Sequence, residues 1–476
     1  MTQQSNPNPP DRLTKDLEEL LSGASSEEFT RRLFFRNLEQ TKATDPKLAE
    51  ILLACAIPRR LDAKTIGILR DEPEDTETNE RLFASLKSFS FVKPRTDEYF
   101  VYHDNTRDVV LKVWESDDNR EKYNRIKEKL AHFYNTQRQE HCSKGELVEG
   151  IADMNSAVEL QPDGLNYFWR GQIHHELQDY PAALVDFDKA IELRPEDANN
   201  YAWRGLVQYA LNDYHAALTD FSKAIELQPE EGLNYYWRGH VHYELVSYPA
   251  ALTDFSKAIE LQPEEGLNYY WRGRLIHREM KNYPAALTDF NKAIELRPKD
   301  PSIYAWRGRV YYSLEIYPAA LIDFTKAIEL RPGDGISYYW RGLIYCGMMD
   351  HQGASSDFHE AVTYLSKVID EYPDVDGNYY WRARSYYELK NYRAALADLN
   401  SSIERAHKAA WFDYYWRGRV HHELQDYEAS LADFRKAIDL EPEESLDFFQ
   451  EVVPHYHSAI YADALLKFEG VFKGTI

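Results

Sequence analysis

The hexapeptide NYYWRG occupies residues 234–239 and returns unchanged at residues 268–273. Its tryptophan belongs to a series: Trp169, Trp203, Trp237, Trp271, Trp306, Trp340, Trp381 and Trp416. Neighbouring members are 34 or 35 residues apart, except for a spacing of 41 between Trp340 and Trp381. A fixed period of this length predicts an array of eight structural repeats, which we number one to eight.

Small and aromatic residues recur within each repeat at fixed distances from the tryptophan, which we place at position 6. In repeat three, Gly239 and Ala251 are small where two antiparallel helices must approach closely. Tyr235 and Phe255 fill the space beside that contact. Pro249 suits the first turn of the second helix, because its missing N–H would have no partner there. A single hairpin cannot bury its apolar face, so the repeats must stack into a solenoid.

This plan resembles the tetratricopeptide repeat, a helix-turn-helix unit with a period of 34 residues, over residues 164–442. The resemblance implies a mostly α-helical protein, a right-handed superhelical α-solenoid whose first helices line a concave groove. The tryptophan at position 6 departs from the family pattern, which has its aromatic residue at position 4. About 100° per residue places position 6 opposite core positions 4, 8 and 11, so the resemblance implies a tryptophan stripe in the groove.

The candidate partner-binding residues lie on this groove-facing side of the first helices. They are Phe168, Trp169, Tyr236, Trp237, His240, Tyr243, Tyr270, Trp271, Arg274, Arg309, Tyr312, Tyr339, Tyr380, Arg384, Tyr387, Tyr415 and Arg419. Arginine beside aromatic rings suits a peptide that carries acidic or aromatic side chains. Two alternatives remain open: each tryptophan packs flat between adjacent first helices, and the arginines form a solvated face.

Two further residues are present in all eight repeats. Position 7 is arginine: Arg170, Arg204, Arg238, Arg272, Arg307, Arg341, Arg382 and Arg417. The second helix carries an aspartate: Asp186, Asp220, Asp254, Asp289, Asp323, Asp357, Asp398 and Asp433. Such regular pairing predicts a structural ladder of bidentate ion pairs. The functional alternative is a row of anion-binding arginines.

Two departures from the period of 34 lead to structural predictions. Repeat four has ten steps from Gly273 to Tyr283, where repeat three has nine from Gly239 to Tyr248, and a π-bulge near residues 274–277 is expected to absorb the extra residue. Repeat six has seven extra residues, close to two helical turns. We therefore expect one long helix from about residue 352 to residue 371, which projects about 10 Å beyond its neighbours.

The chain before the repeats follows another pattern. Apolar spacing predicts helices at 46–56, 62–70, 78–90 and 105–116, with two short strands around a turn at 93–98. With the segments AIPRRLDAKTIGIL, SFSFVKP and YFVYHDNTRDVVLKVW, this order resembles the winged helix of STAND-type NTPases of the NACHT and NB-ARC kind. The resemblance implies a small α+β domain over residues 26–116 that regulates or packs. Residues 1–25 are expected to be flexible, 117–163 to form linker helices and a degenerate capping repeat, and 443–476 to form capping helices.

Composition and motifs narrow the functions. A formal net charge of −23 disfavours nucleic acid and anionic membranes as partners. The sequence contains no GxxxxGK[ST], HExxH or GxSxG motif, so we expect no catalytic residue, cofactor or metal. Three distant cysteines suggest a reducing compartment, and the absence of an apolar run of 18 residues argues against a membrane span. A cytoplasmic location is expected.

These observations predict a non-enzymatic scaffold or adaptor that holds a peptide or partner protein in the groove. By analogy with the winged-helix resemblance, it would be a regulatory component of a bacterial multi-protein signalling or defence system, with the NTPase or effector on another chain. The alternative is a transcriptional or nucleic-acid-binding regulator that uses the winged helix.

Overall fold

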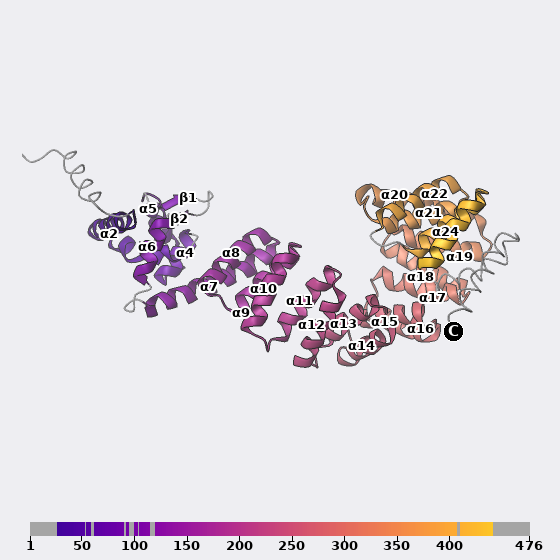
Figure 1. Ribbon diagram of the computed structural model, residues 1–476, viewed down its shortest axis with the longest axis horizontal. Helices are drawn as coiled ribbons and strands as arrows, with labels where there is room; N and C mark the ends of the chain where they lie inside the picture. The colour runs from indigo at the N-terminus through magenta and orange to yellow at the C-terminus, as the bar shows by residue number, and fades with distance from the viewer. Residues whose placement is uncertain are drawn as a thin grey trace, which may run out of the picture. The chain divides into compact units, whose positions relative to one another are not determined.

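The computed structural model describes residues 26–440 except 53, 59–60, 90–91, 95–99, 103, 115–119 and 407–409. The chain forms two compact units, residues 1–245 and 246–476, which we call the N-terminal and C-terminal units and describe separately. Both are mainly helical (Figure 1). The expected flexible segment 1–25 and the expected cap 443–476 lie outside the described residues.

The N-terminal unit opens with short helices and one strand pair: α2 (Ser26–Thr44), α3 (Pro46–Leu52), a 3-10 turn (Ala54–Ala56), α4 (Ala63–Arg70), α5 (Thr76–Leu86), β1 (Val92–Pro94), β2 (Phe100–Tyr102) and α6 (Asp104–Trp114). The strands are antiparallel, with Val92 opposite Tyr102. The predicted helices and strand pair are therefore present, although most of the predicted turn at 93–98 lies outside the described residues. Nothing beyond this element order supports a winged helix.

One core joins this region to the helices that follow, α7 (Arg120–Lys144) and α8 (Leu147–Leu160). Tyr102 is buried, and its hydroxyl donates to the carbonyl of Leu52 over 2.6 Å. Arg107 of α6 donates to Glu159 of α8 over 2.9 Å. Because the core runs from Phe34 to Ile173 without a break, residues 26–116 do not have a hydrophobic core of their own.

The remaining described helices of each unit belong to the repeats, which have two helices each (Figure 1). The N-terminal unit contains α9 (Gly164–Glu176), α10 (Tyr180–Leu193), α11 (Ala198–Ala210), α12 (Tyr214–Leu227) and α13 (Gly232–Glu244). The C-terminal unit contains α14 (Tyr248–Leu261), α15 (Gly266–Glu279), α16 (Tyr283–Leu296), α17 (Pro301–Ser313), α18 (Tyr317–Leu330), α19 (Gly335–Gly347), α20 (His351–Glu371), α21 (Asp376–Glu388), α22 (Tyr392–Arg405), α23 (Trp411–Glu423) and α24 (Tyr427–Leu440).

Glycine at position 8 is required because a phenylalanine of the second helix lies against it. A Cβ atom built on Gly308 would lie 2.7 Å from the Phe324 ring, closer than real contacts allow. In repeat seven the glycine is replaced by Ala383, and the facing phenylalanine is replaced by the smaller Leu399. The two changes compensate each other in volume.

Helix α15 shows that the predicted π-bulge is wrong. The helix is regular from Gly266 to Glu279 and is one residue longer than α13. The turn after it closes with a wider hydrogen bond, from Asn282 N to Ile276 O, whereas Asp213 N donates to Gln208 O in repeat two. The extra residue therefore extends the last turn, so no hydrogen bond inside the helix is disturbed.

Helix α20 is one continuous helix from His351 to Glu371, which confirms the predicted long helix but not its predicted projection beyond its neighbours. Its two extra turns do not project freely, because α21 packs along them: Arg382 of α21 donates to Ser366 over 3.0 Å. In the other repeats the corresponding acceptor follows the ladder aspartate by two residues, whereas Ser366 follows Asp357 by nine. Repeat seven is therefore displaced by two turns along α20, about 10 Å.

The displacement changes which residues of α19 are covered by the next tryptophan. Position 12 of a first helix is normally covered by the next tryptophan, as Tyr312 is by Trp340 with ring centroids 5.5 Å apart. In repeat six, position 12 is Cys346, which is exposed. Trp381 instead lies 6.2 Å from the Trp340 ring, near the middle of α19. The displacement thus leaves the end of α19 at Cys346 uncovered, and Trp381 covers the middle of the helix instead.

Candidate functional site

The first helices carry the candidate side chains, and the arginine ladder holds these helices in place. In the seven pairs whose members lie in one unit, Nε and Nη2 of the arginine donate to the two carboxylate oxygens over 2.6–2.9 Å: Arg170–Asp186, Arg204–Asp220, Arg272–Asp289, Arg307–Asp323, Arg341–Asp357, Arg382–Asp398 and Arg417–Asp433. Arg238 and Asp254 belong to different units.

The third nitrogen of each ladder arginine connects neighbouring repeats. Arg307 Nη1, for example, donates to Asn291 of the preceding second helix over 2.6 Å. Asp323 is 2% exposed, so both of its oxygens are committed to Arg307. The described pairs therefore have the structural role predicted for them, and the anion-binding alternative for this row is not supported.

Five candidate aromatic residues at position 5 are buried: Phe168, Tyr270, Tyr339, Tyr380 and Tyr415. Most of them pack on the second helix of their own repeat, as Tyr339 does on Phe358 with ring centroids 5.8 Å apart. They are core residues that support the groove-facing side without forming its surface. Tyr236 is half-buried, with its ring 4.5 Å from that of His240, a candidate that is itself buried.

Within each unit, the tryptophans that follow another first helix of the same unit lie against that helix. Trp306 is 6.0 Å from the His277 ring and 4.6 Å from the Arg274 guanidinium, both on α15. In the N-terminal unit, Trp237 lies 5.8 Å from Tyr209, and Trp169 lies under Arg138 of α7 at 4.1 Å. The interpretation in which tryptophans pack between adjacent first helices therefore describes this geometry. Most of these indoles keep a partly exposed edge.

The position-9 arginines of the C-terminal unit are stacked on these indoles. Arg274 lies 4.0 Å from the Trp271 ring and Arg309 lies 4.4 Å from Trp306. Arg384 lies 4.4 Å from Trp416, and Arg419 lies 4.3 Å from that same ring. Arg419 also donates to the hydroxyl of Tyr387, the candidate at position 12 of α21, over 3.1 Å. The candidates thus form a row of guanidiniums between aromatic rings.

Arg309 differs electrostatically from the ladder arginines. Burial disfavours the charged form of Arg384, but interactions with Tyr339, Tyr380 and Glu388 outweigh burial and raise the pKa of Arg384. Burial, together with the charges of Arg274 and Arg384, lowers the pKa of Arg309 to about 10. The hydrogen bonds that Arg272, a ladder arginine, donates to Asp289 raise the pKa of Arg272. In the described part of the chain, Arg274, Arg309 and Arg384 form no ion pair within 4.0 Å.

Four donors in this region are buried without a hydrogen-bond partner among the described residues: the Nε atoms of Arg309 and Arg384, the Tyr339 hydroxyl and the Trp340 indole N–H. We call them the donor cluster. Arg309 lies 5.0 Å from the Trp340 ring and Arg384 lies 4.8 Å from the Tyr339 ring. Both guanidiniums also face Trp381, at 5.7 and 5.0 Å.

The sequence analysis named Arg309, Arg384 and Tyr339 of this cluster as candidates. It did not name Trp340 individually, although Trp340 belongs to the expected tryptophan stripe, and its N–H gives no signal in a sequence. The displacement of repeat seven brings Arg384 to Tyr339, and only the spacing of 41 between tryptophans pointed to it. Arg138, which covers Trp169, comes from a segment without the repeat pattern, so no signal could have found it.

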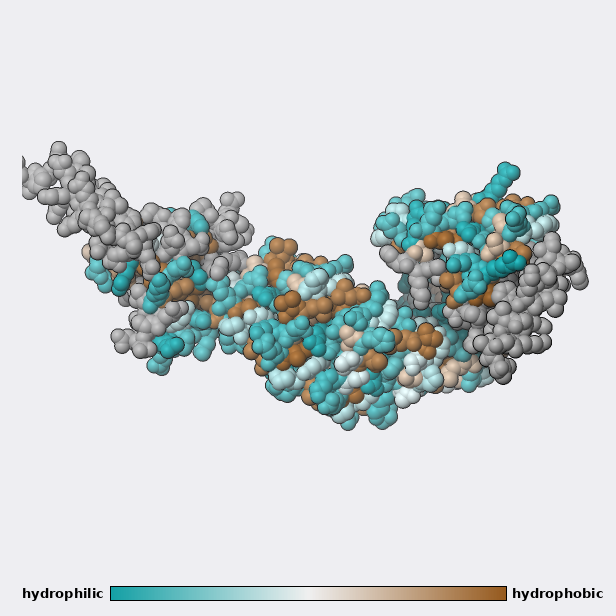
Figure 2. All heavy atoms as spheres, in the orientation of Figure 1, coloured by the Kyte–Doolittle hydropathy of each residue, from teal (hydrophilic) through white to brown (hydrophobic). Residues whose placement is uncertain are grey.

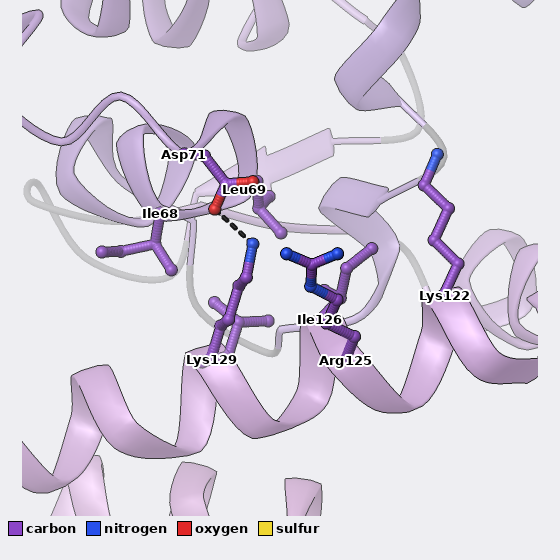
Figure 3. Close-up of a pocket in the computed structure, with 8 residues that line it drawn as sticks. Ile68, Leu69, Asp71, Lys122, Arg125, Ile126 and Lys129 are labelled. Atoms are coloured by element: carbon purple, nitrogen blue, oxygen red, sulfur yellow. Dashed lines mark hydrogen bonds and ion pairs between the residues drawn. The ribbon is translucent and has the colours of Figure 1, made fainter.

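A small pocket of about 130 Å³ lies in the N-terminal unit, between α4 and α7 (Figure 3). Lys122, Arg125 and Lys129 rise from α7, and Lys129 forms an ion pair with Asp71 across the pocket. Of its basic side chains, Lys122 and Arg125 are exposed and Lys129 is half-buried. Over the described residues, no group of three or more His, Cys, Asp or Glu side chains is arranged to bind a metal ion.

The surface has no single large apolar patch on the face shown in Figure 2. Hydrophobic side chains over α8–α13 appear there as separate areas among hydrophilic ones, and Val148 and Val185 are among the exposed residues. In the described part of the chain, no helix is both long and apolar enough to span a bilayer.

Comparisons with known families identify the repeats. Models described as "TPR repeat" or "Tetratricopeptide repeat" match residues 171–212, 204–265, 275–315, 349–413 and 411–444. The chain therefore contains tetratricopeptide repeats, and repeats of this kind generally mediate protein–protein interactions and act as scaffolds. A comparison with curated proteins gives no match.

Several solved structures share the helical repeat. YrrB, described as a TPR protein with an unusual peptide-binding site, is 26% identical over 37% of this chain and 91% of its own, with a TM-score of 0.34. A tetratricopeptide repeat protein from Parabacteroides merdae is 22% identical over 54% of this chain and 99% of its own, with a TM-score of 0.42. PilF from Pseudomonas aeruginosa is 20% identical over 44% and 92%, with a TM-score of 0.38.

Proposed function

We propose that this protein is a non-enzymatic scaffold that binds an extended segment of a partner protein along the first helices of its C-terminal unit. The observation that carries the proposal is the row of position-9 arginines stacked on aromatic rings, in which Arg274, Arg309 and Arg384 form no ion pair within 4.0 Å among the described residues. Aromatic rings and arginine are the side chains that contribute most to protein–protein recognition.

The proposal gives the two rows of arginine in the same helices different roles. The ladder arginines fix the spacing of the first helices, and the position-9 arginines present charge to a ligand. In this view the partly exposed rings of Tyr312 and Tyr387 contact the partner, while the buried rings of Tyr339 and Tyr415 hold the indoles in place.

For residues 26–116 we propose a regulatory docking domain of winged-helix type, followed by a degenerate repeat at 117–163 and repeats at 164–442. The element order from α3 to α6 supports this division. The packing of α8 also supports it, because Asn155 accepts a hydrogen bond from Arg170 over 3.0 Å, as Asp188 does from Arg204. Such a domain would suit a component of a multi-protein signalling system whose NTPase is a separate chain.

Selection from a library of random 12-residue peptides tests the function. The full chain should enrich a family of peptides over an unrelated helical scaffold, and Tyr312→Ala with Tyr387→Ala should weaken their binding by about tenfold. Lys326→Ala, on the exposed side of α18, is the matched control and should bind like the wild type. If no peptide is enriched, or if the double variant binds unchanged while remaining helical, the proposed function is wrong.

A further inference from the structure

The donor cluster lies where the repeat array is displaced. In a regular pair of repeats the tryptophan meets positions 9 and 12 of the preceding first helix, as Trp306 meets Arg274 and His277. Across the displacement, Trp381 instead meets Tyr339 and Trp340, at positions 5 and 6 of α19. Arg384 moves with Trp381, so its guanidinium faces Tyr339 and comes near Arg309. The seven extra residues of α20 therefore build the cluster.

Every unpaired group of the cluster is a donor. Indole and guanidinium nitrogens donate and cannot accept, and the Tyr339 hydroxyl is unpaired as well. Two carboxylates, Asp334 for Arg309 and Glu388 for Arg384, act electrostatically without forming an ion pair within 4.0 Å in the described structure. Buried donors without acceptors are costly, and clustered guanidiniums repel one another. An anionic acceptor from outside would relieve both penalties.

We infer that Arg309 and Arg384, together with Trp340 and supported from below by the buried Tyr339, form a subsite for the side-chain carboxylate of an acidic segment in the partner protein. The inference rests on the proposed function and specifies its ligand. The planar guanidinium matches a carboxylate, and the flanking indoles exclude water from the contact. Because Arg274 and Arg419 continue the row on α15 and α23, the site fits a segment with several acidic side chains better than a single chain terminus.

The chain itself offers substitutions that keep the fold. Leucine stands at position 9 in repeats two and six, as Leu206 and Leu343, so the repeat accepts leucine where repeats five and seven have Arg309 and Arg384. Arg309→Leu and Arg384→Leu should therefore fold. Arg309→Leu should also melt at the same or a higher temperature, because burial and the charges of Arg274 and Arg384 disfavour the charged form of Arg309. Arg307→Leu, in the ladder two residues before Arg309, is the matched control and should melt lower.

The test uses the full chain and the peptides selected from the random library. The wild type should enrich peptides rich in Asp and Glu, and replacing these with Asn and Gln should weaken binding by about tenfold or more. Arg309→Leu with Arg384→Leu should remove that preference, so that acidic and amide peptides bind equally. Amidation of the peptide carboxyl terminus should change nothing.

The outcomes separate the two proposals. Enriched peptides without acidic residues, or an acidic preference that survives Arg309→Leu with Arg384→Leu, would overturn the carboxylate subsite and leave the scaffold function intact. A loss of binding that appears only in the C-terminally amidated peptides would place the carboxylate at a chain end and would also overturn the inference. Failure to enrich any peptide would remove both.

Discussion

The Arg307 guanidinium donates to both oxygens of Asp323, at 2.9 and 2.7 Å, and Asp323 is 2% exposed. We expect Arg307→Ala to lower the free energy of unfolding by about 1–3 kcal/mol, because the substitution leaves a buried carboxylate without its partner. Urea unfolding followed by circular dichroism measures the change. Lys326→Ala breaks an exposed ion pair with Glu329 and should change stability by less than about 0.5 kcal/mol. Equal effects in the two variants would contradict a structural ladder.

Asp413 occupies the position of Asn166 and Asn200 in repeats one and two. Those asparagines donate to carbonyls at the end of the preceding helix, as Asn200 does to Arg194 over 3.2 Å. A carboxylate cannot donate unless it is protonated. Ser402, which stands where the other second helices have alanine, donates to Asp413 over 2.9 Å and partly compensates. Burial still raises the pKa of Asp413 to about 6.

This shift fixes the direction of a pH effect. The folded protein holds the Asp413 proton between about pH 4 and pH 6, where the unfolded chain releases it, so the contribution of Asp413 to stability falls as the pH rises through this window. We expect Asp413→Asn to stabilise the protein by about 2–3 kcal/mol above pH 6 and by little at pH 4. Thermal unfolding at pH 4 and pH 7 measures the difference. A gain of the same size at both values would show that the Asp413 proton is not responsible.

A helical wheel misplaced the position-5 side chains because it treats each helix as isolated. Tyr339 lies beside the apolar face of its own helix, and contact with Trp381 of the next first helix completes its burial. The small residues and the ladder were predictable, since their role lies within one hairpin. The environments of Tyr339 and Trp340 depend on the neighbouring repeat, and periodicity within one repeat carries no information about it.

At the scale of elements, seven extra residues were easier to predict than one. Seven is close to two turns, so α20 keeps one buried face and can only lengthen. A single residue can be absorbed inside α15 or at its end, and the sequence does not state which costs less. The structure places it at the end of the helix, where the closing hydrogen bond simply widens.

Deleting residues 359–365 should restore a regular repeat. The joined sequence DFSKVIDEYP matches DFTKAIELRP of repeat five, and Ser366 then follows Asp357 by two residues. Repeat seven should move back along α20, and Trp381 should cover Cys346 as Trp340 covers Tyr312. In a Cys142→Ser background, with Cys55 buried, a thiol reagent should label Cys346 more slowly after the deletion. An unchanged labelling rate in a folded deletion variant would contradict the displacement.

At the scale of the whole chain, the sequence predicted the two kinds of region and the helical repeat, because both depend on patterns that recur or alternate. The hydrophobic core continues across the predicted boundary at residue 116. Arg107 of α6 also forms an ion pair with Glu159 of α8 across this boundary. The site was predicted as a face of the first helices. Its electrostatic character depends on which guanidiniums lack a nearby carboxylate. This depends on which side chains lie close together in the folded chain.

The displaced repeat also affects how a ligand would have to be spaced. A segment that contacts both α17 and α23 crosses an offset of about 10 Å, which is the length of about three extended residues. Its recognition elements would then not recur at one constant interval. The partner segment would carry two groups of contact residues separated by three additional residues. One group would contact the repeats before the displacement and the other the repeats after it. The length of α20 would therefore determine the spacing between the two groups of contact residues in the partner's sequence.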